Sequence, residues 1–261
     1  PTDGGYLLLT PDEKRELISK DSSCEKWIRP YSMGNEFINK IERYCLWLLD
    51  ITTDELQDMP LIYERVCAVR EMRLLSAKAA TRKRAETPWL FDEVRYPKGI
   101  YIGIPKVSSS RRKYIPFGFV TNGMIPGDKL FFVETDSPYH FGILMSQFHN
   151  AWMRTVAGRL KGDYSYSNTI VYNNFVWPEA TNLQKESIER TAKAILDTRS
   201  NYPNKSLADL YDPDKMPADL LAAHKANDSA VEAAYGDDFN GDEEKIVAHL
   251  FKLYAEKAKE K

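Results

Sequence analysis

The chain has 261 residues, of which 43% are hydrophobic and 12% aromatic, so it can form the core of one large domain or two ordinary ones and is not an unfolded polypeptide. The formal net charge is −2, yet residues 61–115 carry thirteen Lys or Arg against five Asp or Glu, while residues 1–60 and 179–261 are acidic. A single basic block in a nearly neutral chain is typical of a surface that meets a polyanion, although a solvated helix face would give the same pattern.

The cysteines and the apolar runs indicate the compartment. Cys24, Cys45 and Cys67 are odd in number and lie in structured-looking segments, so they predict free thiols in a reducing compartment. No apolar run approaches membrane-spanning length, and no signal peptide is present. We therefore expect a cytoplasmic protein with no membrane partner. The chain begins at Pro1 rather than Met, which is consistent with a piece cut from a longer protein.

The first third of the chain predicts helices and one strand. Thr10 precedes Pro11 and lies three residues before Glu13, which predicts a helix to Lys20 that begins with a capping box. The apolar run from Arg43 to Asp50 has the length of a strand. Leu61 to Ala80 alternates apolar residues with arginines, which predicts a long amphipathic helix with a basic polar face. The arginines of that face are Arg65, Arg70 and Arg73.

The middle of the chain predicts a strand-rich region followed by a helix. Four segments have strand length and are separated by Gly, Pro, Ser and Asn residues that favour turns: Trp89–Tyr96, Ile100–Val107, Tyr114–Val120 and Lys129–Glu134. Tyr139 to Leu160 then reads as one helix. Its aromatic and aliphatic face is more typical of core than of a ligand site, and consists of Phe141, Leu144, Met145, Phe148, Trp152 and Val156.

The composition changes near residue 180. The residues that follow are acidic and rich in alanine, and their pattern predicts helices. Helices are predicted at Gln184–Arg199, Ala218–Tyr235 and Asp242–Ala258, with a short turn from Leu207 to Tyr211. We therefore predict an α+β protein with a mixed, strand-rich domain over residues 1–180 and a helical domain over residues 181–261.

The sequence contains no recognisable active site. It has neither a Gly-rich nucleotide loop after a strand nor a G-x-S-x-G motif, and its histidines and cysteines lack metal-ligand spacing. Asn173-Asn174-Phe175 echoes the amine-gripping loop of amino-methyltransferases, but the prolines of that loop are missing, as is the Gly-rich turn that binds S-adenosylmethionine. We predict no catalytic residue, no metal and no cofactor for this chain by itself, and leave open whether it is an enzyme.

Three basic segments suit nucleic acid, because Lys, Arg, hydroxyl and backbone N–H groups are the usual partners of DNA phosphates. The first follows the basic helix, the second is a polar loop between two strands, and the third follows the aromatic helix. A flexible hairpin tip is an alternative explanation of the second segment. The residues expected to contact the DNA backbone or groove are Arg82, Lys83, Arg84, Lys106, Ser108, Ser109, Arg111, Arg112, Lys113, Arg159, Tyr164, Tyr166 and Ser167.

Lys161 and Asp163 in the third segment suit the reading of a base pair. In an extended segment, residues two apart project to the same side. Lys donates to guanine O6 and N7, and Asp accepts from cytosine N4, so the two could read both halves of one G·C pair. Gly162 between them would let the backbone approach the groove closely. A weak surface ion pair between Lys161 and Asp163 would explain the same residues.

Several long motifs resemble the recognition domain of type IIL (MmeI-like) restriction–modification enzymes. They include Gly34-Asn35-Glu36-Phe37-Ile38, Ala85-Glu86-Thr87-Pro88-Trp89, Gly158-Arg159-Leu160-Lys161-Gly162-Asp163-Tyr164 and Val171-Tyr172-Asn173-Asn174-Phe175. Ser206-Leu207-Ala208-Asp209-Leu210-Tyr211-Asp212-Pro213 is similar to the C-terminal helical part of these enzymes. Two positions depart from the family pattern: Gly162 stands where Ser is common, and Ser165 where Arg is often found.

The resemblance implies a larger bacterial parent protein and a DNA partner. Such enzymes are single chains that join a nuclease region, an adenine-N6 methyltransferase domain, a target-recognition domain and C-terminal helices, and this chain resembles only the last two. S-adenosylmethionine, and Mg²⁺ for cleavage, are implied for the parent protein. The resemblance also implies that Lys161 and Asp163 jointly select G on the strand that is read. A nuclease with an unrecognised site and a protein-interaction scaffold remain the alternatives.

Overall fold

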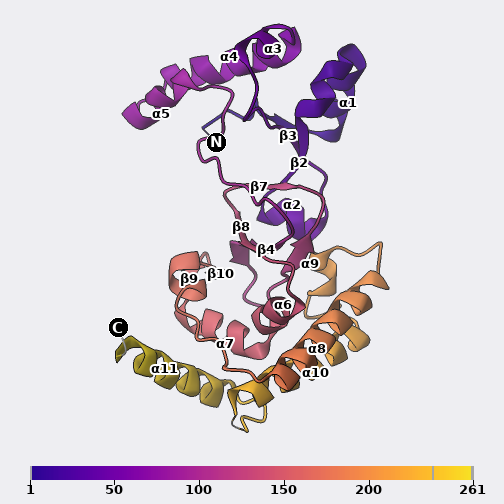
Figure 1. Ribbon diagram of the computed structural model, residues 1–261, viewed down its shortest axis with the longest axis vertical. Coiled ribbons are helices and arrows are strands. Elements are labelled where there is room, and N and C mark those ends of the chain that lie inside the picture. The colour runs from indigo at the N-terminus through magenta and orange to yellow at the C-terminus, as the bar shows by residue number, and fades with distance from the viewer. Residues whose placement is uncertain (1, 237, 260–261) are drawn as a thin grey trace. The chain divides into compact units, whose positions relative to one another are not determined.

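The computed structural model describes residues 2–236 and 238–259, and these form two compact units (Figure 1). Unit 1 comprises Pro1–Ser32, Ile41–Lys98 and Thr121–Gly127. Unit 2 comprises Met33–Lys40, Gly99–Val120 and Asp128–Lys261. Each unit is therefore assembled from segments that lie far apart in the sequence.

Unit 1 is built on a four-stranded sheet in the order β1-β3-β2-β7. Its strands are β1 (Leu8–Leu9), β2 (Ile28–Ser32), β3 (Tyr44–Leu46) and β7 (Ile125–Pro126). The pairs β1–β3 and β2–β3 are antiparallel, and β2–β7 is parallel. β3 confirms the strand predicted between Arg43 and Asp50, although it is shorter.

Helices complete unit 1: α1 (Pro11–Lys20), η1 (Ser22–Trp27), α3 (Thr53–Gln57), α4 (Pro60–Leu74), α5 (Ala79–Lys83) and η2 (Arg84–Glu86). The predicted capping box of α1 is confirmed, since Glu13 N donates to Thr10 Oγ1 and the Glu13 carboxylate accepts from Thr10 N. The long helix predicted over residues 61–80 is instead two helices separated at 75–78. The strand predicted at Trp89–Tyr96 is wrong, because this segment is irregular.

Unit 2 holds two three-stranded sheets and the short helix α2 (Gly34–Asn39). The first sheet is antiparallel in the order β6-β4-β8, with β4 (Tyr101–Pro105), β6 (Gly118–Val120) and β8 (Leu130–Glu134). The second has the order β5-β10-β9, with β5 (Val107–Ser108), β9 (Gly158–Leu160) and β10 (Asp163–Ser165). This second sheet carries the predicted base-reading residues.

The helix predicted from Tyr139 to Leu160 is α6 (Pro138–Met145) and α7 (Gln147–Val156), followed by β9. The break is at Ser146, whose Oγ accepts from His149 N and caps α7. The assignment of the aromatic face to the core is confirmed, since Phe141, Phe148 and Trp152 are all buried. A π-helix, η3 (Asn168–Tyr172), follows β10.

The described residues after 180 form the helices α8 (Asn182–Ser200), α9 (Leu207–Leu210), α10 (Ala218–Tyr235) and α11 (Glu243–Lys259). α10 has the predicted bounds, and α8 and α10 run side by side over α6 (Figure 1). At the crossing of α6 and α8, a Cβ on Gly142 would lie 2.7 Å from Ile188 Cγ2, so only glycine allows this approach. The apolar residues of these helices share one core with residues 102–175. The α+β class is confirmed, and the domain boundary near residue 180 stays a prediction.

Candidate nucleic-acid interface

The predicted base-reading residues lie at the tip of the β9–β10 hairpin. Asp163 pairs with Leu160 across the two strands, so Lys161 and Gly162 form a two-residue turn. Both turn residues have positive φ, 51° for Lys161 and 94° for Gly162, as a type I′ turn requires. The prediction of an extended segment through Lys161 is therefore wrong, because the chain reverses there. The hairpin still brings Lys161 and Asp163 to the same tip.

The two side chains at the tip do not form an ion pair with each other. Lys161 is exposed, and its ammonium has no hydrogen-bond partner among the residues that the structure describes. Asp163 is half-buried, and its Oδ1 accepts from the Ser110 backbone N–H at 3.3 Å. The tip therefore offers a cation and a carboxylate that are both available to a ligand, which argues against the surface ion pair.

The basic loop Ser109–Lys113 lies beside this hairpin because β5, which precedes it, pairs with β10. Arg111 and Lys113 are exposed and Arg112 is half-buried. Arg111 forms an ion pair with Asp214, while the Lys113 ammonium lies 5.3 Å from the Tyr114 ring centre. The structure thus brings together two of the three predicted basic segments on unit 2.

Three of the predicted DNA contacts are buried instead. Ser108, Tyr164 and Tyr166 expose 3%, 7% and 2% of their surface, so their side chains cannot meet DNA in this conformation. Tyr166 hydrogen-bonds to His149 Nε2 at 3.0 Å, and burial raises the pKa of its hydroxyl well above the ordinary value. The Arg159 guanidinium lies 3.8 Å from the ring centre of Tyr164, and this cation–π contact holds Arg159 against the hairpin.

The remaining residues of unit 2 that were predicted to contact DNA are half-buried and interact with other parts of the protein. Ser167 is half-buried and caps η3, its Oγ accepting from Ile170 N at 3.3 Å. Lys106 is half-buried with its ammonium 5.1 Å from the ring centre of Phe131. Ser109 is half-buried, and its carbonyl accepts from Arg112 N at 3.1 Å, which closes the turn of the loop.

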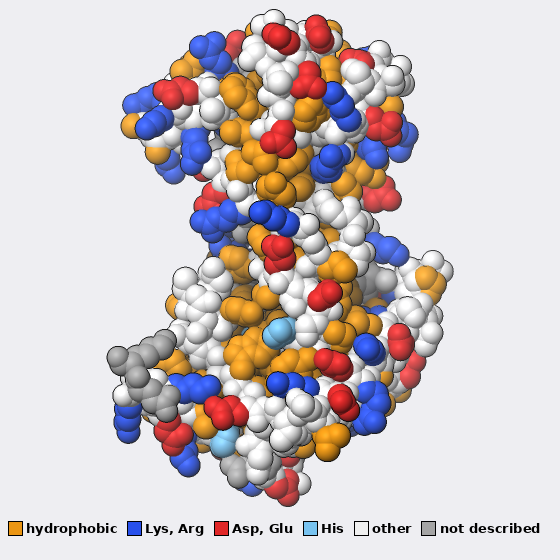
Figure 2. All heavy atoms as spheres, viewed as in Figure 1, with side chains coloured by type: hydrophobic (Ala, Val, Ile, Leu, Met, Phe, Trp, Pro, Cys, Tyr) orange, Lys and Arg blue, Asp and Glu red, His pale blue; other side chains and the backbone are white. Residues whose placement is uncertain are grey.

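The triplet Arg82, Lys83 and Arg84 belongs to unit 1, and all three residues are exposed. Arg82 donates to the carbonyls of Ser76 and Ala77, which join α4 to α5, and Arg84 pairs with Asp92 at 3.2 Å. Figure 2 shows blue side chains gathered around α4 and α5 on the face that it presents. These cations form a separate basic patch on unit 1.

The predicted basic face of α4 is wrong in one respect. Arg73 is fully buried and donates to four backbone carbonyls, those of Thr2, Arg84, Thr87 and Leu90. It therefore binds irregular segments of unit 1 together and is unavailable to DNA. Burial lowers the pKa of Arg73, and Asp3 and Asp92 oppose that shift.

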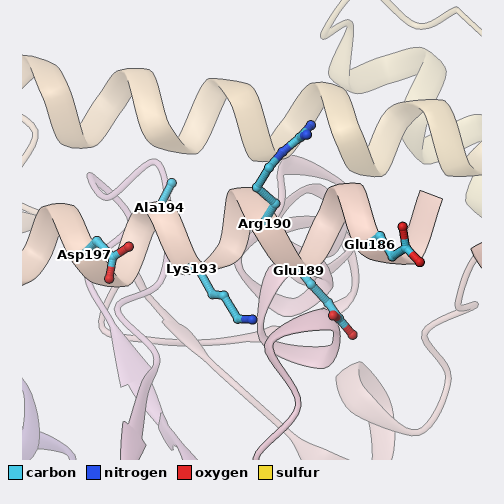
Figure 3. A pocket seen from close by; sticks show the side chains of 6 residues that line it. All are labelled: Glu186, Glu189, Arg190, Lys193, Ala194 and Asp197. Carbon is cyan, nitrogen blue, oxygen red and sulfur yellow. The ribbon is translucent and has the colours of Figure 1, made fainter. Parts of the chain in front are cut away.

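The described residues offer little evidence of a metal site or of a deep ligand pocket. Within residues 2–236 and 238–259, no cluster of His, Cys, Asp and Glu could hold a metal ion. A shallow hollow runs along one face of α8 and mixes three carboxylates with two cations (Figure 3). Among the described helices, none has the length and apolarity needed to cross a membrane.

The comparison with known families decides the relationship. A model of the MmeI target-recognition domain matches residues 1–179, and a model of the MmeI C-terminal domain matches residues 180–260. The chain belongs to the MmeI family. This confirms the relationship indicated by the sequence motifs.

Two longer proteins show the extent of the similarity to other MmeI-family members. DNA methyltransferase A of Bacillus subtilis (strain 168) is 38% identical over 257 residues, which are 98% of this chain and 29% of that protein. The solved structure of the type IIL restriction–modification enzyme MmeI in complex with DNA is 43% identical, with a TM-score of 0.95 over 98% of this chain. This chain spans 34% of that MmeI chain, so it corresponds to about a third of such a protein.

Proposed function

We propose that this chain is the double-stranded DNA recognition module of a bacterial type IIL restriction–modification DNA adenine-N6 methyltransferase. The observation that carries the proposal is the β9–β10 hairpin, which presents Lys161 and Asp163 beside the basic loop Ser109–Lys113. The close likeness of this fold to a structure solved with DNA supports it.

In this proposal the hairpin tip reads one G·C pair from the major groove. The Lys161 ammonium donates to guanine O6 and N7, and the Asp163 carboxylate accepts from cytosine N4. Asp163 Oδ1 accepts from Ser110 N–H, and in this proposal Oδ2 accepts from the cytosine. The type I′ turn makes the tip narrow, which suits insertion into a groove that admits a two-stranded ribbon.

Phosphate contacts supply affinity without sequence preference. On unit 2 we assign them to Lys113 and Arg159, which are exposed, and to Arg111 once it leaves Asp214. On unit 1 we assign them to the patch that contains Arg82, Lys83 and Arg84.

The chemistry of the parent protein belongs to its other domains in this proposal. The chain covers 29% of a DNA methyltransferase, and we place the S-adenosylmethionine site, and the Mg²⁺ site for DNA cleavage, in the remainder of the parent chain. The methyltransferase domain of the same chain is then a second partner. A cytoplasmic location follows from this role, because the substrate is the DNA of the cell.

A selection on randomised duplex DNA at low salt tests the proposal. We expect enrichment of a short motif with a fixed G·C pair, and loss of that pair when Lys161 and Asp163 are both replaced by Ala. Binding without an enriched motif would show that the chain binds DNA only through its basic surface, without sequence preference. No binding by the complete parent protein would contradict the proposal and favour an interaction scaffold.

A further inference from the structure

Leu160 is an exposed apolar residue at the end of β9, next to the turn of the β9–β10 hairpin (Figure 1). Its exposed fraction is 53%, and in the part of the chain that the structure describes neither apolar core includes it. A single exposed leucine is ordinary on a protein surface. What distinguishes Leu160 is its neighbour, because it pairs with Asp163 across the two strands.

The register places Leu160 and Asp163 on one face of the small sheet. Residues directly opposite in an antiparallel pair share a face, and successive residues of a strand alternate between the two faces. Tyr164 follows Asp163 and therefore points to the other face. It pairs with Ser108 of β5, and both side chains are buried. The core lies against that other face, so Leu160 and Asp163 share the face that is open to a ligand.

The charges around Leu160 favour DNA as the ligand. Lys161 follows Leu160 in the turn, Arg159 precedes it on β9, and both are exposed. Lys113 of the neighbouring basic loop is exposed as well. An apolar side chain among three cations suits a polyanion with apolar groups on its surface better than the apolar face of a second protein.

The role assigned to Asp163 brings Leu160 close to a second base pair. Directly opposite residues of an antiparallel pair have Cβ atoms about 4.5–5.5 Å apart, and successive base pairs are about 3.4 Å apart. When Asp163 accepts from cytosine N4, the Leu160 side chain therefore reaches the major-groove edge of an adjacent pair. The apolar group on that edge is the C5-methyl of thymine. Over a purine, leucine would displace water from acceptors such as N7 and leave them unpaired.

We propose that Leu160 is a specificity-determining residue, which contacts the C5-methyl group of a thymine in the base pair next to the G·C pair. The inference rests on the proposed function, because it requires Asp163 to read cytosine. It adds an apolar contact to the two polar ones and extends the sequence that the hairpin reads from one base pair to two. The selected motif should then contain a T·A pair beside the fixed G·C pair.

Replacing that thymine by deoxyuridine tests the inference, because the replacement removes only the methyl group. The complete parent protein is bound in competition to duplexes that carry thymine or deoxyuridine at either pair flanking G·C. For the wild type we expect deoxyuridine at one flanking pair to weaken binding about fourfold, the effect of one methyl group that is no longer buried. Leu160→Ala shortens the side chain and should bind the two duplexes equally. The matched control, Leu183→Ala, changes a leucine that is 78% exposed on α8 and should keep the wild-type ratio.

The remaining outcomes overturn the inference. A G·C motif without an adjacent T·A pair, or a wild type that binds thymine and deoxyuridine duplexes equally, refutes the role of Leu160 while the proposed function stands. A fourfold ratio that persists in Leu160→Ala assigns the methyl contact to another residue. If thermal unfolding shows that Leu160→Ala does not fold, the polar variant Leu160→Gln replaces it and is judged by the same ratio. A wild type that selects no G·C pair refutes the proposed function, and the inference with it.

Discussion

Exchanging the charges at the hairpin tip should reverse the preferred base pair. In the double variant Lys161→Glu with Asp163→Arg, the introduced carboxylate would accept from cytosine N4 and the introduced guanidinium would donate to guanine O6 and N7. The preference should change from G·C to C·G. Lys161 is already a non-glycine residue at positive φ, so Glu at this position meets a similar backbone cost, and the turn glycine Gly162 is unchanged.

The magnitude follows from the contacts at the tip. One good base contact discriminates by about 1–3 kcal/mol, which is roughly a fivefold to 150-fold ratio of affinities. The exchange conserves net charge, so the slope of log affinity against log salt should stay nearly constant. The introduced arginine cannot accept from Ser110 N–H as Asp163 does, so total affinity should fall even as the preference reverses.

The assay is competition binding with two labelled duplexes at several salt concentrations. The matched control places the same two substitutions on α8, as Lys193→Glu with Asp197→Arg, where both side chains line the hollow of Figure 3. This control should change neither the preference nor the salt slope. An unchanged G·C preference in the hairpin variant, with its fold intact, would refute the assignment of Lys161 and Asp163.

Three further predictions concern the phosphate patch, the helix crossing and a buried acid. Replacing Arg82 and Arg84 by Ala should weaken all sequences alike and reduce the salt slope by up to about 2, as salt titrations would show. Gly142→Ala should destabilise the protein by about 1–3 kcal/mol in denaturant unfolding, since its Cβ would meet Ile188, whereas Gly158→Ala has open space and should change stability by less than about 0.5 kcal/mol. Burial raises the pKa of Asp228 from 3.8 to about 6, so its contribution to stability is complete below pH 3.8 and is lost as pH rises through about 6. Relative to wild type, Asp228→Asn should therefore gain up to about 3 kcal/mol between pH 4 and 7, and a constant difference would contradict this.

Local signals predicted much of the fold correctly. The capping box of α1, the bounds of α10 and the buried aromatic face of α6 and α7 depend on residues close in sequence, so the chain pattern reveals them. Tyr164 and Tyr166 were instead predicted as DNA contacts and are buried, because residues two apart in an extended segment share a face but the spacing does not tell whether that face meets core or solvent. The turn at Lys161-Gly162 had a signal as well, since two residues ending in Gly between strands favour a hairpin.

The position of Arg73 could be predicted from the sequence, but its hydrogen-bond partners could not. It continues the buried row Ile62, Val66 and Val69 at helical spacing, so its position on the apolar face was visible. The four carbonyls that accept its hydrogen bonds come from segments outside its helix, and no local pattern predicts them. The Ser110 N–H contact with Asp163 is likewise tertiary, which is why the loop and the hairpin were predicted as separate features.

The shared core of unit 2 has a consequence for synthesis on the ribosome. Phe117 and Phe141 lie in one apolar cluster with Ile188, Val231 and Leu250, which are translated much later. The cluster therefore cannot close until Leu250 has emerged, and its many long-range contacts make it a slow-folding part of the molecule. Under the proposed function, selection of a DNA sequence therefore depends on residues as late as Leu250, and a copy truncated before α11 would lack part of this core.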